Sequence, residues 1–396
     1  MDFVVARRSD LLCGRLMALY YAMAISNKYN CGYGLTWPNA KMANPDVALE
    51  EVFSSEYQER IFVKEKRFWQ ELVPNSQSLE NFAGVDAANN LVVEANHLAQ
   101  IPVELRSDPM PTMASLLPKN ALHKDLRQCL ETSAFGTDMT GVHVRHGDVV
   151  DGNWKHFGHM MRFVPYDVIN WYLDKLGKRE NIVVFSDESN ALEQIQLAPR
   201  GESKEFRTLA PYQSVHLDLS DLFQMAHCSQ ILCPERSAYS AFAAVYYGAE
   251  RSNLTLDVAT EWVRDVPSVD PVSVSAAYYC KRNLYIVEAI ERAKRVSNQI
   301  EFIDKLLAEA YEIYPENAQI YALRLKYKNI LPTQHDAEKD MTKYVELVGS
   351  EKGGVMCAQG VAQLNEVRAG CAQAKTRDLE ILQTAVTELQ AIQASL

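Results

Sequence analysis

The stretch TGVHVRHGDVVDGNW (residues 140–154) decides how this chain of 396 residues folds. A short apolar run leads into histidine, arginine and aspartate, and a polar turn containing glycine follows. Apolar strands of this kind, alternating with helices, are typical of a parallel sheet that is buried on both faces. Such a sheet binds ligands beyond the carboxyl ends of its strands. Residues 145–148 therefore stand where a ligand site is expected.

The same alternation extends from this stretch in both directions. Downstream, the pattern predicts strands at NIVVFSD (181–187) and SQILCP (229–234), and helices at VPYDVINWYLDKLG (164–177), SDLFQMAHC (220–228) and SAYSAFAAVYYGA (237–249). Upstream, it predicts strands at DFVVAR (2–7) and YGLTWP (33–38), joined by a helix at GRLMALYYAMAISNKYN (14–30). Strand, helix and strand in succession form a βαβ unit. The sequence therefore predicts two α/β domains that face a cleft, residues 1–138 and 139–275.

A different pattern begins near residue 276 and continues to residue 396. Long helical periodicity with few β-branched runs predicts an all-α domain. AYEIYPENAQIYALRL (310–325) resembles the junction of two helices in a tetratricopeptide-type repeat, and Pro315 is predicted to begin the second helix. A single helix pair cannot bury both of its faces. We therefore expect this domain to pack on the α/β domains or on a second subunit, which would make a homodimer.

Charge and composition limit the partners and the compartment. The net charge of −11 argues against nucleic acid or an anionic membrane as the main partner. Arg7, Arg8, Asp10 and Arg15 interrupt the apolar N-terminal residues, so no spanning helix is predicted there. The eight cysteines are scattered without zinc-site spacing, which predicts buried thiols in a reducing compartment. We expect a cytoplasmic protein.

Arg145 is the first candidate ligand residue at the predicted strand ends. Its planar guanidinium matches phosphate oxygens, and strand alternation places His143 on the same face. Asp148 follows it, and Asp187 ends the next predicted strand. The simpler interpretation is an ion pair between Arg145 and Asp148 that closes the strand.

The third strand end adds Arg236, Ser237 and Ser240 at the start of a predicted helix, where free backbone amides attract anions. Ser237 could instead be a plain helix cap. Gly14 and Arg15 open the first helix and are expected to face the cleft from the other domain. These residues together fit a pyrophosphate. The sequence carries no Walker loop, no complete dinucleotide fingerprint, and no Asp-x-Asp or histidine spacing that indicates a metal site.

These motifs resemble those of the α1,2-, α1,6- and protein O-fucosyltransferase superfamily. HVRHGD (143–148) is similar to its His-x-Arg-Arg-x-Asp or His-x-Arg-x-Gly-Asp motif, with His146 in place of a second arginine. VVFSDES (183–189) resembles its second motif, SDLFQMAHCSQILCPERSAYS (220–240) its third, and LLCGRLMALYYAMAIS (11–26) its first-helix glycine segment. In the third motif, the resemblance implies that Asp221 contacts the nucleotide base and that Ser237 contacts phosphate.

The resemblance implies a GT-B-like enzyme with two Rossmann-like domains. It would transfer a sugar from a GDP-sugar, with GDP-fucose as the expected donor, to a glycan or other hydroxyl acceptor, by inversion and without a metal or a further cofactor. Arg145 would stabilise the leaving diphosphate. Asp151, on the loop after the first motif, is the candidate base, although it also suits a solvated turn. Another nucleotide-sugar donor, or a non-catalytic protein whose helical tail binds a partner, remain the alternatives.

Overall fold

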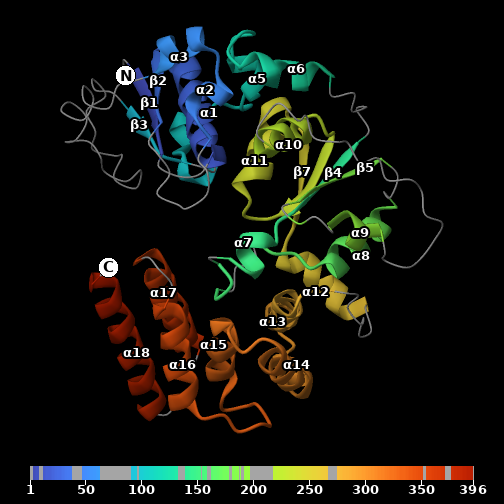
Figure 1. Ribbon diagram of the computed structural model, residues 1–396, viewed down its shortest axis with the longest axis vertical. Coiled ribbons are helices and arrows are strands. Elements are labelled where there is room, and N and C mark those ends of the chain that lie inside the picture. Colours follow the sequence, from blue (N-terminus) through green and yellow to red (C-terminus); the bar gives the residue numbers. More distant parts are fainter. Residues whose placement is uncertain are drawn as a thin grey trace.

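Two parallel sheets form the centres of two α/β units, and a bundle of helices follows them (Figure 1). The computed structural model describes residues 3–8, 12–37, 47–62, 91–95, 98–132, 139–152, 154–157, 162–177, 181–186, 188, 191–196, 217–265, 274–350, 354–370 and 376–395. In that part of the chain, the predicted order of α/β units followed by helices is confirmed.

The first sheet has β1 (Phe3–Arg7) between β2 (Gly32–Thr36) and β3 (Leu91–Val93), and all its pairs are parallel. Helix α1 (Leu12–Tyr29) joins β1 to β2, as predicted. Its residues are buried on every side from Leu12 to Ser26, because it packs on its own sheet and also on α11 (Ala238–Tyr247) of the second unit. The two α/β units therefore share an apolar interface.

The second sheet has the order β5 (Ile182–Ser186), β4 (Thr140–Val144), β6 (Gln230–Pro234) and β7 (Glu250–Leu254), with all neighbours parallel. Every residue of β4 and β6 is buried, so neither strand carries a charged residue on either face. Helices pack on both faces of this sheet, so alternate strand residues belong to two separate apolar cores. These helices are α10 (Leu217–Ala226) and α11 (Ala238–Tyr247) on the face toward the first unit, and α8 (Tyr166–Leu176) and α12 (Leu256–Asp265) on the opposite face.

Short helices complete the α/β units. Glycine ends two of the longer helices, since Gly177 after α8 and Gly248 after α11 have φ of 61° and 83°, a region that other residues rarely adopt. The short elements are α2 (Leu49–Val52), α3 (Ser55–Ile61), η3 (Leu98–Gln100), η4 (Val103–Leu105), α5 (Met113–Leu116), α6 (Lys124–Thr132), α7 (Gly147–Val150) and α9 (Ala191–Gln196).

The C-terminal region is helical from α13 onward. Ser275 caps α13, because its Oγ accepts a hydrogen bond from the Tyr278 amide at 3.1 Å. The elements are α13 (Ala276–Arg292), η5 (Val296–Asn298), α14 (Ile300–Ile313), α15 (Ala318–Tyr327), α16 (Ala337–Gly349), α17 (Gly354–Gly370) and α18 (Thr376–Ser395). Their relation to tetratricopeptide repeats stays a prediction.

The helix junction differs from the prediction in one detail. The expectation that Pro315 begins the second helix was wrong, because α15 begins at Ala318. Asn317 caps it, and the Asn317 side chain accepts a hydrogen bond from the Gln319 amide at 3.0 Å. Pro315 lies outside the helix, where its carbonyl accepts from the Tyr321 hydroxyl at 2.9 Å.

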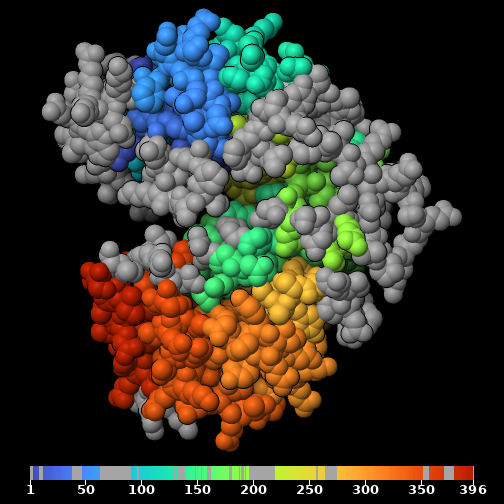
Figure 2. All heavy atoms as spheres, in the orientation of Figure 1, coloured from blue at the N-terminus to red at the C-terminus, as the bar shows by residue number. Residues whose placement is uncertain are grey.

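The helical region packs on the second α/β unit, as one of the two expected arrangements required. One apolar core runs from Val142 on β4 to Leu389 on α18. Figure 2 shows the N-terminal unit, in blue, and the helical region, in orange and red, at opposite ends of the molecule, with the second α/β unit, in green, between them. Among the described helices, none is long and apolar enough to cross a membrane. The prediction of buried thiols is confirmed for five cysteines but was wrong for Cys31, which is only half-buried, and Cys371 lies outside the described residues. The buried ones are Cys13, Cys228, Cys233, Cys280 and Cys357.

Candidate functional site

Three parallel strands of the second sheet have their carboxyl ends at the same side of the sheet, which is called the strand edge below. Val144 at the end of β4 pairs with Ser186 at the end of β5, and Val142 pairs with Leu232 of β6. The chain segments after these strands, which carry most of the candidate residues, therefore start from neighbouring positions. This is the edge at which the sequence predicted an anion site.

His143 and Ser237 meet at this edge. Ser237 caps α11, since its Oγ accepts a hydrogen bond from the Ser240 amide at 3.4 Å. The same oxygen lies 3.2 Å from Nδ1 of His143, so its hydroxyl proton is available to that nitrogen. Burial, reinforced by the positive charge of Arg145, lowers the pKa of His143 to about 3. The ring is therefore neutral near pH 7, and it joins β4 directly to the N-terminus of α11.

Arg251 was not predicted as a site residue. It lies on β7 and donates from Nη2 to the carbonyl of Glu235 at 2.7 Å, while its Nε donates to Sγ of Cys233 at 3.2 Å. These contacts fix the backbone between β6 and the capping Ser237. The neighbouring candidate Arg236 is exposed. A signal for Arg251 would have required β7 to be recognised, and the polar sequence of that edge strand hides it.

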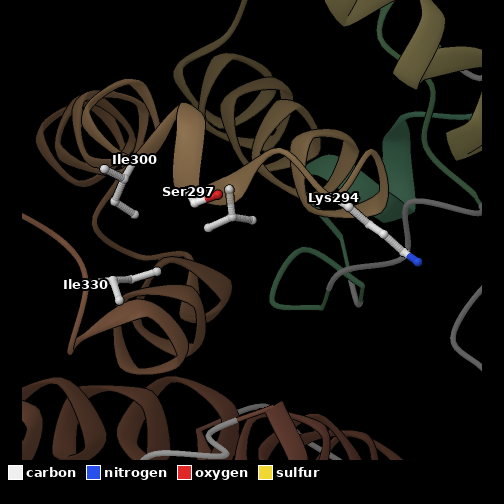
Figure 3. A pocket seen from close by; sticks show the side chains of 5 residues that line it. Lys294, Ser297, Ile300 and Ile330 are labelled. Atoms are coloured by element: carbon white, nitrogen blue, oxygen red, sulfur yellow. The ribbon is translucent and has the colours of Figure 1, made fainter.

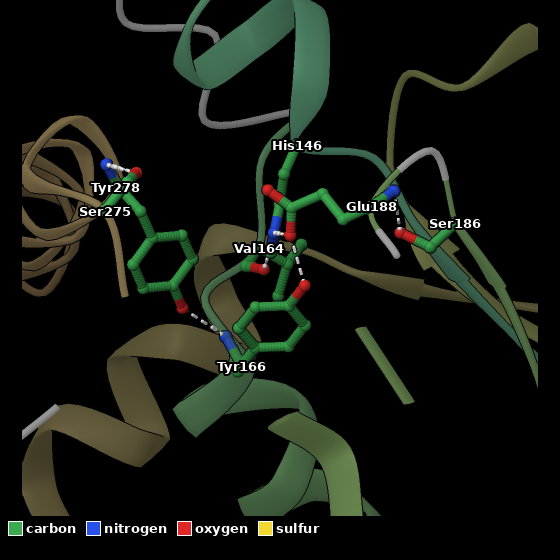
Figure 4. A network of polar contacts seen from close by, with 7 residues as sticks. All are labelled: His146, Val164, Tyr166, Ser186, Glu188, Ser275 and Tyr278. Atoms are coloured by element: carbon green, nitrogen blue, oxygen red, sulfur yellow. Dashed lines mark hydrogen bonds and ion pairs between the residues drawn. The ribbon is translucent and has the colours of Figure 1, made fainter. Parts of the chain in front are cut away.

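His146 points into the protein (Figure 4). Its Nε2 lies 2.8 Å from the carbonyl oxygen of Val164 and its Nδ1 lies 3.0 Å from Oε2 of Glu188. Because carbonyl and carboxylate oxygens only accept, both ring nitrogens donate in these two contacts. The Tyr166 hydroxyl donates to the same Glu188 oxygen, and the Tyr278 ring lies against the imidazole. The residue that replaces the second arginine of the family motif thus forms a buried network.

Glu188, which the sequence did not single out, brings a second carboxylate close to the candidate base. Burial alone would raise the pKa of Glu188, but hydrogen bonds from His146 and Tyr166 outweigh it and the pKa is lowered. Asp151 ends the short helix α7, so the predicted loop begins with a helical turn. Partial desolvation and the charge of Glu188 raise the pKa of Asp151, against the opposing charge of Lys155. A raised pKa makes a carboxylate a better proton acceptor.

The N-terminal candidates lie in the first turn of α1. Gly14 and Arg15 are both buried, and the Arg15 side chain is fully enclosed. Its guanidinium lies 4.2 Å from the centre of the Trp37 ring, a cation–π contact within the N-terminal unit. The Trp37 indole donates to the carbonyl of Val47 at 3.0 Å. Arg15 therefore packs the start of α1 against Trp37, the residue directly after β2.

The remaining candidates are less closely defined. Asp221 is half-buried in the middle of α10. Asp148 belongs to α7, but its side chain lies outside the described part of the chain, as does the whole of Asp187. Across the described ranges, no three histidine, cysteine, aspartate or glutamate side chains gather in a metal-binding arrangement.

A pocket lies elsewhere, in the helical region (Figure 3). No residue that lines it comes from the α/β units, so it is separate from the strand edge. The lining residues are Lys294, Val296, Ser297, Ile300 and Ile330.

The chain is structurally similar to fucosyltransferases. One is fucosyltransferase NodZ from Bradyrhizobium, with a TM-score of 0.39 and 16% identity over 61% of this chain and 92% of that chain. NodZ α-1,6-fucosyltransferase soaked with GDP-fucose gives 0.38 and 16% over 62% and 92%. POFUT1 in complex with GDP gives 0.35 and 11% over 64% and 98%. No protein-family model and no curated protein matches the sequence. At these identities and scores the likeness carries no argument about activity.

Proposed function

We propose that this protein is a glycosyltransferase that moves a sugar from a nucleotide sugar to a hydroxyl acceptor, by inversion and without a metal. The contact between His143 and Ser237 carries the proposal, because it fixes the N-terminus of α11 against the end of β4. Arg145 is the next residue but one along the chain, close enough to lower the pKa of His143. A helix N-terminus and a guanidinium at one sheet edge are the groups that a diphosphate needs.

The chemistry follows from this placement of charge. When the bond between the sugar and the diphosphate breaks, the leaving diphosphate gains negative charge. Fixed donors at the end of β4 and at the start of α11 lower the barrier, because they need no reorganisation during the reaction. Asp151 is the proposed base for the acceptor hydroxyl, and its raised pKa suits that role.

The proposed donor is GDP-fucose. The support is the motif resemblance, in which Asp221 occupies the base-contacting position of the third motif. The proposed acceptor is a glycan or another hydroxyl compound, and the proposed location of the protein is the cytoplasm.

Calorimetry with GDP, UDP and CMP tests the proposal, followed by transfer assays with the matching nucleotide sugars in the presence and absence of EDTA. We expect selective binding of GDP and transfer that survives chelation. A ligand at about 100 times its Kd should also stabilise the fold by about 2.7 kcal/mol. Selective binding of UDP would change the donor. Failure to bind any nucleotide would refute the proposed glycosyltransferase activity.

A further inference from the structure

A segment that follows Asp151, residues 155–157, forms hydrogen bonds with the C-terminal helices. Lys281 on α13 is fully buried, and its Nζ donates to the carbonyl of Phe157 and lies 3.4 Å from that of Lys155. From α15, the Ala318 amide donates to Nδ1 of His156 at 3.2 Å. Three successive residues of the segment thus bond to two helices that lie far along the chain.

The two helices that hold this segment, α13 and α15, are also hydrogen-bonded to each other. Gln319 on α15 accepts from Nζ of Lys281 at 3.2 Å and donates to a carboxylate oxygen of Glu288 at 2.5 Å. Burial lowers the pKa of Lys281, and the Glu288 carboxylate opposes that shift. A buried ammonium without hydrogen-bond partners costs free energy, so the fold is most stable when Lys281 stays bonded to the carbonyls of the segment.

Helix α13 also touches the network beside the strand edge. The Tyr278 hydroxyl accepts from the Tyr166 amide at 2.8 Å, and Arg282 forms an ion pair with Asp167 (the first contact is drawn in Figure 4). Tyr166 in turn donates to Glu188, whose charge raises the pKa of Asp151. One helix of the C-terminal region therefore reaches the surroundings of the candidate base by two routes.

We propose that the helical region positions Asp151, through Lys281 and the N-terminus of α15, so that its carboxylate meets the acceptor hydroxyl. This role rests on the proposed glycosyl transfer. The simpler alternative is that α13 only closes the apolar core. Core packing alone would not require a buried lysine on two carbonyls of the one segment that follows the candidate base.

The first test compares Lys281→Met with Lys326→Met. Lys326 belongs to the same region and is paired with Glu291 at 2.6 Å, but it is on α15 and bonds to no residue of the segment. We expect Lys281→Met to lower kcat by about 10- to 100-fold, since a misplacement of about 1 Å can cost about 100-fold. Nucleotide Kd should stay within about twofold of the wild-type value, and Lys326→Met should keep kcat. The double variant Lys281→Met/Glu288→Gln removes the charge left unpaired and serves if the single variant does not fold.

The second test uses His156, because its role as acceptor can be kept or removed. Asparagine places an oxygen where Nδ1 stood, so His156→Asn should retain most of the turnover, whereas His156→Leu should lose about tenfold or more. The acidic limb of the kcat–pH profile should move in His156→Leu and stay in His156→Asn.

Folded Lys281→Met and His156→Leu proteins with wild-type kcat would overturn the positioning role. Parallel loss of nucleotide affinity would also overturn it, because the helices would then act on the donor site. A wild-type protein that transfers no sugar from any nucleotide sugar would refute the proposed function itself, and the positioning role with it.

Discussion

His143 offers the most direct test of the strand-edge geometry, because its burial makes stability depend on pH. Its pKa falls from 6.5 to about 3 in the folded chain. Between these values the unfolded chain binds a proton that the folded chain does not, so stability is present above about pH 6.5 and is lost as the pH falls toward about 3. One pKa unit corresponds to about 1.36 kcal/mol, so a drop to about pH 5 should cost about 2 kcal/mol through this ring.

The assay is urea unfolding of wild type and His143→Phe at about pH 7.5 and about pH 5, followed by tryptophan fluorescence. Phenylalanine fills the site and cannot titrate. Between the two pH values, the wild type should lose about 2 kcal/mol more of its free energy of unfolding than the variant does. Ser237→Ala is the matched control, because it removes the same hydrogen bond but keeps the imidazole. Its pH dependence should follow the wild type, although it is less stable at both pH values.

Equal losses in wild type and His143→Phe would refute the reasoning. The ring would then be able to take up its proton in the folded chain, which a neutral imidazole enclosed between Ser237 and the strand edge cannot do without cost. The fixed contact between β4 and the N-terminus of α11, and with it the main support for the diphosphate site, would be lost.

Arg145→Lys should lower kcat/KM by the equivalent of about 2–4 kcal/mol of transition-state stabilisation, because the point charge of an ammonium cannot reproduce the planar fork of the guanidinium. Near wild-type kinetics would contradict this role. Asp221→Ala should weaken GDP binding in calorimetry, whereas Asp151→Asn should spare binding and reduce transfer; normal transfer by the latter would mean that another group is the base. Removal of all residues from α13 onward should destabilise what remains, since one core joins β4 to α18, and a truncated protein with wild-type Tm would contradict that shared core.

Apolar runs made the central strands predictable. β4, β5 and β6 were expected from the sequence because strands buried on both faces leave a continuous signal. β7 was missed, because its sequence ERSNL belongs to a polar edge strand, and β3 has only three residues. Arg251 was missed together with β7.

Side-chain direction was harder to predict than strand position. His143 was expected at the strand edge and lies there, in contact with Ser237. Glu188 was missed because its partners, His146 and Tyr166, come together only after the sheet has formed. Lys281 was missed for the same reason, since a lysine in a helix is usually solvated and only the carbonyls of a distant segment justify its burial.

The basic residues at this edge differ in their charge, and the difference matters for an anion. His143 is buried and neutral, so the interior of the edge contributes a hydrogen-bonding ring without a net charge. Arg251 carries its charge but directs Nη2 toward the Glu235 carbonyl, which stiffens the chain before Ser237. In the proposed site, positive charge for the diphosphate would come from Arg145, from the exposed Arg236 and from the amides at the start of α11. The proposed diphosphate is therefore expected to bind at the end of the sheet and not inside the apolar core.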